Sequence, residues 1–90
     1  MATLIKVDGS EQEVHPEKGT TFTLEELQNL VGGYIERIQV GSKEMYLNED
    51  GKMKRLPLNR RATMIARLAG IADSDYVVGD VLIGISKEFD

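Results

Sequence analysis

The sequence contains no cysteine, a single histidine and only two prolines, and no apolar run approaches the roughly 20 residues that a membrane-spanning helix needs. The lack of cysteine excludes disulfides, thiolate metal ligands and cysteine nucleophiles. The opening residues, Met1 to Lys6, have no charged leader, long apolar stretch or cleavage site. We therefore expect a cytoplasmic protein without a membrane partner.

The composition that remains is typical of a folded chain. Of the 90 residues, 41% are hydrophobic and 29% are charged, and the net charge is −4. These values are far from the low hydrophobicity and high charge of disordered proteins. We predict a single small α+β domain over residues 1–90 with one modest core. Because a small core leaves little net stability, a homodimer remains open.

Turn and capping signals predict the elements of the first half. Thr3 to Val7 and Glu11 to His15 are predicted strands, joined by a turn at Asp8-Gly9. The sequence Thr23-Leu24-Glu25-Glu26 matches a capping box, which begins a helix, and Gly32-Gly33 can end that helix in a left-handed conformation. The first half should therefore form a hairpin followed by a helix.

Two more strands are predicted, Tyr34–Val40 and Glu44–Leu47, with a turn at Gly41-Ser42. Ile35 is out of phase with the other β-branched residues of its strand, which implies either a bulge or burial on both faces. Asp50-Gly51 is again a turn signal.

The second half holds a helix and a final strand. Lys52 to Leu58 can include a short strand that ends near Pro57. Asn59 can cap a second helix that ends before Gly70, and Tyr76 to Ile85 is predicted to be a buried central strand bent at its glycines. The order is ββαββ(β)αβ, which favours two helices packed on a mainly antiparallel sheet.

Positive charge is concentrated in one segment. Between Gly51 and Ala72 there is no acidic residue, and the six cations give this segment +6 against −10 for the remainder: Lys52, Lys54, Arg55, Arg60, Arg61 and Arg67. A basic face attracts nucleic acid, nucleotides or an acidic protein surface. The alternative is a solvated helix face whose charges pair with acids of the same chain.

The most specific arrangement in this segment is a candidate anion site at the start of the second helix. It consists of Asn59, Arg60 and Arg61, with Lys52, Lys54 and Arg55 as additional contacts. Free N–H groups of a helix start and arginine guanidinium groups both bind phosphate or carboxylate. Helix capping alone also explains the asparagine, and nearby acids such as Glu49, Asp50 or Asp80 can supply the negative charge.

No pattern of catalytic or metal-binding residues is apparent. His15 stands beside Pro16 without a serine or aspartate at a spacing that suggests a relay. The acidic residues near Asp50 and Asp75 lack the regular ligand spacing of a calcium loop. Gly32-Gly33 follows a helix and does not precede one, so it does not form a phosphate-binding loop. We predict no catalytic residues, no metal, no cofactor and no enzymatic activity.

Four segments, taken together, resemble a family of small phage and mobile-element proteins that is catalogued only as a domain of unknown function. Their order and spacing carry the resemblance: Leu30-Val31-Gly32-Gly33-Tyr34-Ile35-Glu36, Tyr46-Leu47-Asn48-Glu49-Asp50-Gly51-Lys52, Leu56-Pro57-Leu58-Asn59 with Ala62-Thr63, and Val78-Gly79-Asp80-Val81. The resemblance implies an accessory protein of a phage or plasmid. It implies no activity and no functional residue.

Two functions remain open. The first is a protein-interaction module directed at a host factor, which the small size, the acidic net charge and the lack of a catalytic set favour. The second is a binder of a phosphate-bearing ligand, a nucleotide or nucleic acid, through the basic segment 52–67. A small enzyme is a third alternative, and it would need a catalytic group assembled by dimerisation.

Overall fold

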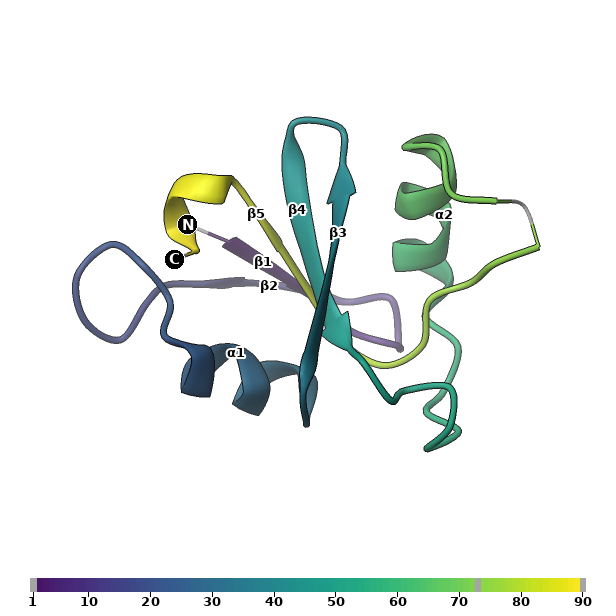
Figure 1. Ribbon diagram of the computed structural model, residues 1–90, viewed down its shortest axis with the longest axis horizontal. Coiled ribbons are helices and arrows are strands. Elements are labelled where there is room, and N and C mark those ends of the chain that lie inside the picture. The colour runs from purple at the N-terminus through teal and green to yellow at the C-terminus, as the bar shows by residue number, and fades with distance from the viewer. Residues whose placement is uncertain (1, 73, 90) are drawn as a thin grey trace.

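The computed structural model describes residues 2–72 and 74–89, which form a sheet with a helix on either side (Figure 1). The elements are β1 (Ala2–Ile5), β2 (Glu11–Val14), α1 (Leu24–Val31), β3 (Ile35–Val40), β4 (Lys43–Asn48), α2 (Arg60–Leu68), β5 (Val81–Gly84) and a short 3-10 helix, η1 (Ser86–Glu88). No helix of the described part of the chain is both long enough and apolar enough to cross a bilayer. The predicted α+β class is confirmed.

The five strands form one antiparallel sheet in the order β2-β1-β5-β4-β3. The hairpins β1–β2 and β3–β4 are each local in sequence, and the last strand, β5, inserts between them. Leu82 of β5 lies opposite Leu4 of β1 on one side and opposite Tyr46 of β4 on the other. The five-stranded sheet is therefore complete only when the last strand, β5, pairs with the first strand, β1. This agrees with the prediction of a central final strand.

Each face of the sheet carries its own core cluster, because successive side chains of a strand point to opposite faces. One cluster includes Val81 and Ile83 of β5 with Ala62 and Ala66 of α2. The other includes Leu82 of β5 with Leu27 of α1, and it extends to Phe22, just before α1, and to Phe89, near the carboxyl end of the chain. The fold is thus a three-layer arrangement of α1, sheet and α2.

The same alternation explains the irregular phase of Ile35. The β3–β4 register runs without interruption from Ile35 opposite Asn48 to Val40 opposite Lys43, so no bulge is present in β3. Ile35 packs with the α1 cluster, whereas Ile38 packs with the α2 cluster. Of the two alternatives that the sequence left open, burial on both faces is the one observed.

The helix ends are as predicted. The Thr23 hydroxyl accepts a hydrogen bond from the Glu26 N–H (3.1 Å), and the Glu26 carboxylate accepts one from the Thr23 N–H (2.9 Å), which is a complete capping box. The hydrogen bonds that the Glu26 carboxylate accepts from the N–H groups of Thr23 and Glu17 lower the pKa of Glu26. Gly32 ends α1 in the left-handed region with φ 81°. Asn59 caps α2.

Two segments differ from the sequence prediction. Lys52 to Leu58 does not contain a strand, because Asp50 and Gly51 accept hydrogen bonds from Lys54 and Leu56 and coil this segment into turns. The final strand covers only Val81–Gly84 of the predicted Tyr76 to Ile85. The chain turns at Gly79 (φ 77°), and Val78 makes an isolated bridge with Leu58.

Arg55 lies in the turn segment with φ 57°, the one positive φ outside glycine in residues 2–72 and 74–89. A left-handed conformation is roughly 1 kcal/mol unfavourable for a residue with a Cβ. We expect Arg55→Gly to raise the free energy of unfolding by about 0.5–1 kcal/mol in urea titrations. Lys54→Gly, next to it but without a positive φ, is the control and is expected to destabilise; equal effects of the two substitutions would contradict this prediction.

Candidate functional site

Asn59, the centre of the candidate anion site, lies in the interior of the protein. Its side chain is fully buried, at 0% exposure. The amide oxygen accepts a hydrogen bond from the Ala62 N–H (3.0 Å), and the amide nitrogen donates to the carbonyls of Ile5 (3.0 Å) and Gly79 (2.8 Å). Both donors of the amide are therefore used within the fold. Asn59 joins α2 to β1 and to the loop before β5.

Lys52, Arg61 and Lys54 of the basic segment contact different parts of the fold. Lys52 forms an ion pair with Asp75 and lies 4.4 Å above the ring of Tyr76. Arg61 pairs with Glu11 of β2. Lys54 approaches Gly33 at the carboxyl end of α1, where a cation is favoured by the helix dipole.

Arg55 is exposed in the turn segment, and Arg60 lies on the outer face of α2. The structure therefore does not bring Lys52, Lys54, Arg55, Asn59, Arg60 and Arg61 together at one site. Two of these cations are neutralised by acids of the same chain, but by Asp75 and Glu11 and not by the acids nearest in sequence. Asp80, one of the expected partners, accepts a hydrogen bond from the Val7 N–H instead (3.0 Å).

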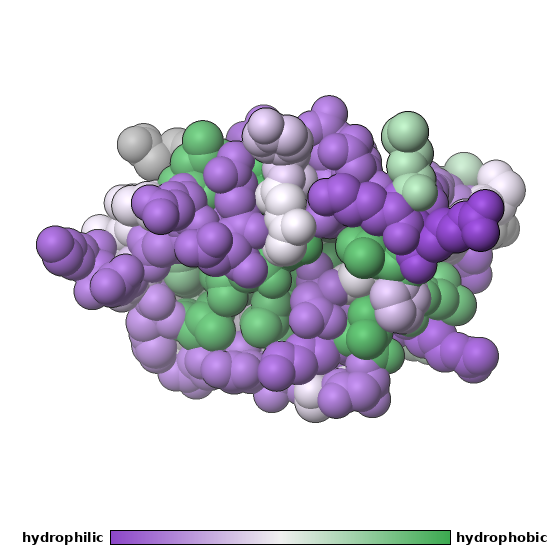
Figure 2. Space-filling view, turned by 90° about the horizontal axis from the view of Figure 1, so that it is seen from below, coloured by the Kyte–Doolittle hydropathy of each residue, from purple (hydrophilic) through white to green (hydrophobic). Residues whose placement is uncertain are grey.

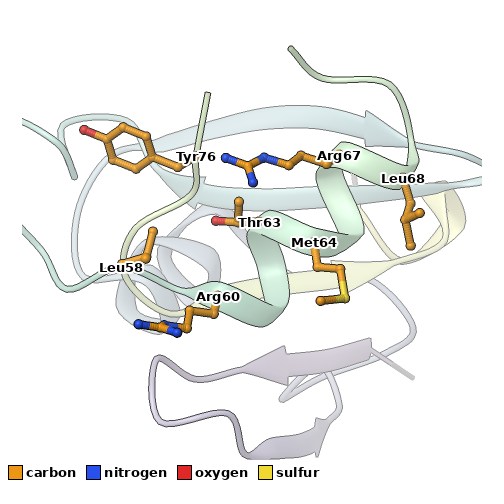
Figure 3. A pocket seen from close by; sticks show the side chains of 7 residues that line it. All are labelled: Leu58, Arg60, Thr63, Met64, Arg67, Leu68 and Tyr76. Carbon is orange, nitrogen blue, oxygen red and sulfur yellow. The ribbon is translucent and has the colours of Figure 1, made fainter. Parts of the chain in front are cut away.

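The outer face of α2 forms one side of an open groove with a volume of about 810 Å³. Figure 3 shows the seven side chains that line it, which come from α2 and from the two loops that flank it: Leu58, Arg60, Thr63, Met64, Arg67, Leu68 and Tyr76. The large apolar residues are strongly exposed, with Met64 at 64% and Leu68 at 85%. In Figure 2, hydrophobic residues interrupt the hydrophilic surface on the side of the molecule where α2 lies and also in the opposite half.

The groove exists because α2 is apolar on two faces. Ala62 and Ala66 are completely buried against the sheet, and they are small enough to let the helix approach it closely. Met64 and Leu68, four residues apart, lie together on another face and point to solvent. Sequence reasoning missed this pair. Its signal was the i, i+4 spacing of two large apolar residues on a different face from Ala62 and Ala66.

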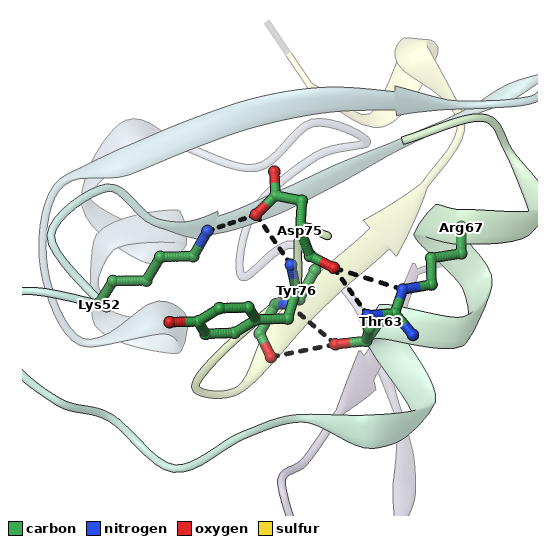
Figure 4. Close-up of polar contacts among 6 residues, drawn as sticks. Lys52, Thr63, Arg67, Asp75 and Tyr76 are labelled. Atoms are coloured by element: carbon green, nitrogen blue, oxygen red, sulfur yellow. Dashed lines mark hydrogen bonds and ion pairs between the residues drawn. The ribbon is translucent and has the colours of Figure 1, made fainter. Parts of the chain in front are cut away.

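Hydrogen bonds fix the opposite wall of the groove to α2 (Figure 4). The Thr63 hydroxyl accepts from the Val77 N–H (2.8 Å) and donates to the Val77 carbonyl (3.3 Å). The Arg67 guanidinium donates two hydrogen bonds to the Asp75 carbonyl (3.0 and 3.3 Å). The Asp75 carboxylate accepts from the Tyr76 N–H (2.8 Å) and pairs with Lys52, whose ammonium lies above the Tyr76 ring. Tyr76 is thus held in place as part of the wall.

The Lys52–Asp75 pair makes the stability of this wall depend on pH. The hydrogen bond from Lys52, followed by that from the Tyr76 N–H, holds the pKa of Asp75 below its usual value. Because the pKa of Asp75 is lower in the folded state, its carboxylate stabilises the fold at pH values above the unfolded-state pKa of about 3.9. This stabilisation is lost as the pH falls through the folded-state pKa.

We expect Asp75→Asn to lower the urea midpoint at pH 7 and to lower it less at pH about 2, because protonation of Asp75 in the wild type removes the negative charge that pairs with Lys52. Glu17→Gln, which removes another exposed carboxylate, is the control. A deficit of Asp75→Asn that is the same at both pH values would show that the ion pair does not contribute.

The groove is electropositive as well as apolar. Arg60 and Arg67 line it, and none of its seven lining residues is acidic. The Arg67 side chain is bound to the Asp75 carbonyl, whereas the Arg60 side chain has no hydrogen bond or ion pair with any residue in 2–72 or 74–89. A groove of this kind can bury apolar side chains of a ligand and can offer a guanidinium group to a ligand anion.

Groups of three or more histidine, aspartate and glutamate side chains that could hold a metal ion are not found in residues 2–72 and 74–89. A family model described as "Domain of unknown function (DUF3846)" matches residues 2–88. Searches of curated proteins and of solved structures gave no match.

Proposed function

Since the chain belongs to this family of domains of unknown function, which assigns it no activity, we propose that it is a protein-interaction module that acts through the α2 groove. In this proposal it is a phage-type accessory protein, and its partner is a host factor. The groove binds a segment of that factor that carries apolar side chains next to aspartate or glutamate. The function is binding and not catalysis.

The observation that supports this proposal is the exposure of large apolar side chains around one concave surface. Leu58, Met64, Leu68 and Tyr76 all keep more than two fifths of their area exposed. Complete burial of a side chain such as Leu or Met contributes about 1.5–3 kcal/mol. After the cost of association, a few such contacts suit a micromolar complex, for which the free energy of binding is about −8 kcal/mol.

Charge selects the kind of partner. In a two-fold symmetric dimer the same patch meets itself, so Arg60 and Arg67 of one copy would approach those of the other. Like charges at an interface are unfavourable, which argues against a second copy of this chain in the groove. A segment of a different protein that carries carboxylates meets the same arginines with opposite charge.

A phosphate-bearing ligand is the alternative, because arginine also binds phosphate. Only two of the cations of the basic segment line the groove, and the rest of its lining is mostly apolar. Nucleic-acid binding needs several phosphate contacts, each of which adds a slope of about −0.9 to the dependence of log K on log salt. The groove offers few such contacts, so it favours a protein segment.

The proposal is tested by selecting peptides from a random display library on the purified chain and measuring their affinity in solution. We expect enriched peptides that combine apolar and acidic residues. Met64→Glu places a negative charge in the groove, which repels the acidic residues of the peptide. It should weaken peptide binding at least about tenfold. Leu24→Glu is the matched control, because Leu24 is similarly exposed (59%) but lies on α1, and it should leave binding unchanged.

Two outcomes would overturn the proposal. One is the absence of any enriched peptide, and the other is equal binding by wild-type chain and Met64→Glu. Binding of short DNA, RNA or nucleotides at low salt, with no peptide binding, would support the phosphate-ligand alternative instead.

A further inference from the structure

The two ends of the α2 groove differ in chemistry. Arg60 and Leu58 lie at the end where α2 begins, and Met64 and Leu68 lie further along the helix (Figure 3). Arg67 lies beside Leu68 at the carboxyl end of α2, but its guanidinium is already bound to the Asp75 carbonyl. Arg60 is the lining cation that makes no such contact within the described part of the chain.

From this asymmetry we infer that the groove recognises a directional motif: one aspartate or glutamate carboxylate of the partner against Arg60, and an aliphatic or aromatic side chain between Met64 and Leu68. This inference rests on the proposed function and adds the chemistry and orientation of the partner segment. Arg60 is then the residue that determines specificity, while Met64 and Leu68 supply the apolar contact.

The availability of Arg60 decides which arginine binds the carboxylate. A guanidinium donates two parallel hydrogen bonds to a carboxylate, and this geometry requires two adjacent N–H groups that face the ligand. Arg67 directs Nε and one terminal nitrogen at the Asp75 carbonyl, so a ligand would have to compete with that contact. Arg60 can meet the carboxylate without breaking any contact of the described fold.

The length of α2 sets the spacing within the motif. A side chain seated between Met64 and Leu68 lies about six residues beyond Arg60, which is roughly 9 Å along the helix axis at 1.5 Å per residue. A partner in extended conformation covers this distance in about three residues, at roughly 3.3 Å each. A helical partner covers it in about six. The acid and the apolar anchor should therefore not be adjacent in sequence.

The test uses the tightest-binding peptide from the display selection, made synthetically in its acidic form and with each acid replaced by its amide. Fluorescence anisotropy gives the Kd of each form for the wild-type chain, Arg60→Gln and Arg61→Gln. Arg61 is the matched control, because it neighbours Arg60 in sequence but pairs with Glu11 and does not line the groove.

We expect one acid-to-amide change to weaken binding about fivefold in wild type and in Arg61→Gln, and less than about twofold in Arg60→Gln. That acid should stand about three or six residues from the apolar anchor. Peptides that bind through Met64 but show no preference for acid over amide, or the same preference in Arg60→Gln, would overturn this inference and leave the proposed function standing. Failure of all peptides to bind would remove both.

Discussion

Asn59→Asp is expected to lower the free energy of unfolding by at least about 3 kcal/mol. The substitution keeps the oxygen that caps α2, but it removes the two N–H donors that serve the carbonyls of Ile5 and Gly79. It also places a negative oxygen against both of those carbonyls at a position with 0% exposure. A buried charge without a partner is among the most destabilising changes known in proteins.

Urea unfolding at several pH values measures this effect. The deficit should shrink as the pH falls, because the buried carboxyl has a raised pKa and its protonated form can again donate a hydrogen bond. Asn29→Asp is the control, since Asn29 is exposed on α1, and it should change stability by about 0.5 kcal/mol or less. If Asn59→Asp were as stable as Asn29→Asp, Asn59 would not be the link between α2 and the sheet.

Leu82→Ala and Leu68→Ala are expected to have opposite effects on stability and on peptide binding. Leu82 is fully buried in the central strand β5, and its truncation should cost about 3–4 kcal/mol of stability because it leaves a cavity. Leu68 is exposed, so its truncation should change stability by no more than about 0.5 kcal/mol. Leu68→Ala should weaken the binding of a selected peptide, whereas Leu82→Ala should leave that binding unchanged.

Chemical denaturation and peptide titration on the same two variants give both quantities. Leu82→Ala must be assayed at a temperature where it is still folded, so that its peptide affinity reflects an intact groove. A stability loss in Leu68→Ala comparable with that in Leu82→Ala would mean that Leu68 serves the core. Undiminished peptide binding by Leu68→Ala would remove it from the docking surface.

The sequence predicted the elements whose signals are local. The capping box at Thr23, the cap at Asn59 and the glycine end of α1 depend on residues within one helical turn, and all three are present in the structure. The alternation that places Ile35 on one face and Ile38 on the other is also local. Such features follow from backbone geometry that neighbouring residues determine.

The residues of the candidate site could not be placed in this way, because their partners are distant in sequence. The Arg61–Glu11 pair forms across elements 50 residues apart in the chain, and the buried contact of Asn59 with Ile5 spans 54. Both depend on the insertion of β5 between the two hairpins, which sets where α2 lies. The cations of residues 52–67 are close together in the sequence, but the turns and α2 point their side chains in different directions.

Chemical-shift mapping with the ¹⁵N-labelled chain tests most directly whether the α2 groove is the binding surface. The probe is the tightest-binding peptide from the display selection, added in steps to the intact protein. We predict that amide shifts change mainly at Leu58, along α2 and around Tyr76, and that Met64→Glu abolishes these changes. Shift changes centred on α1 near Leu24, with the amides of α2 unaffected, would contradict the proposed function.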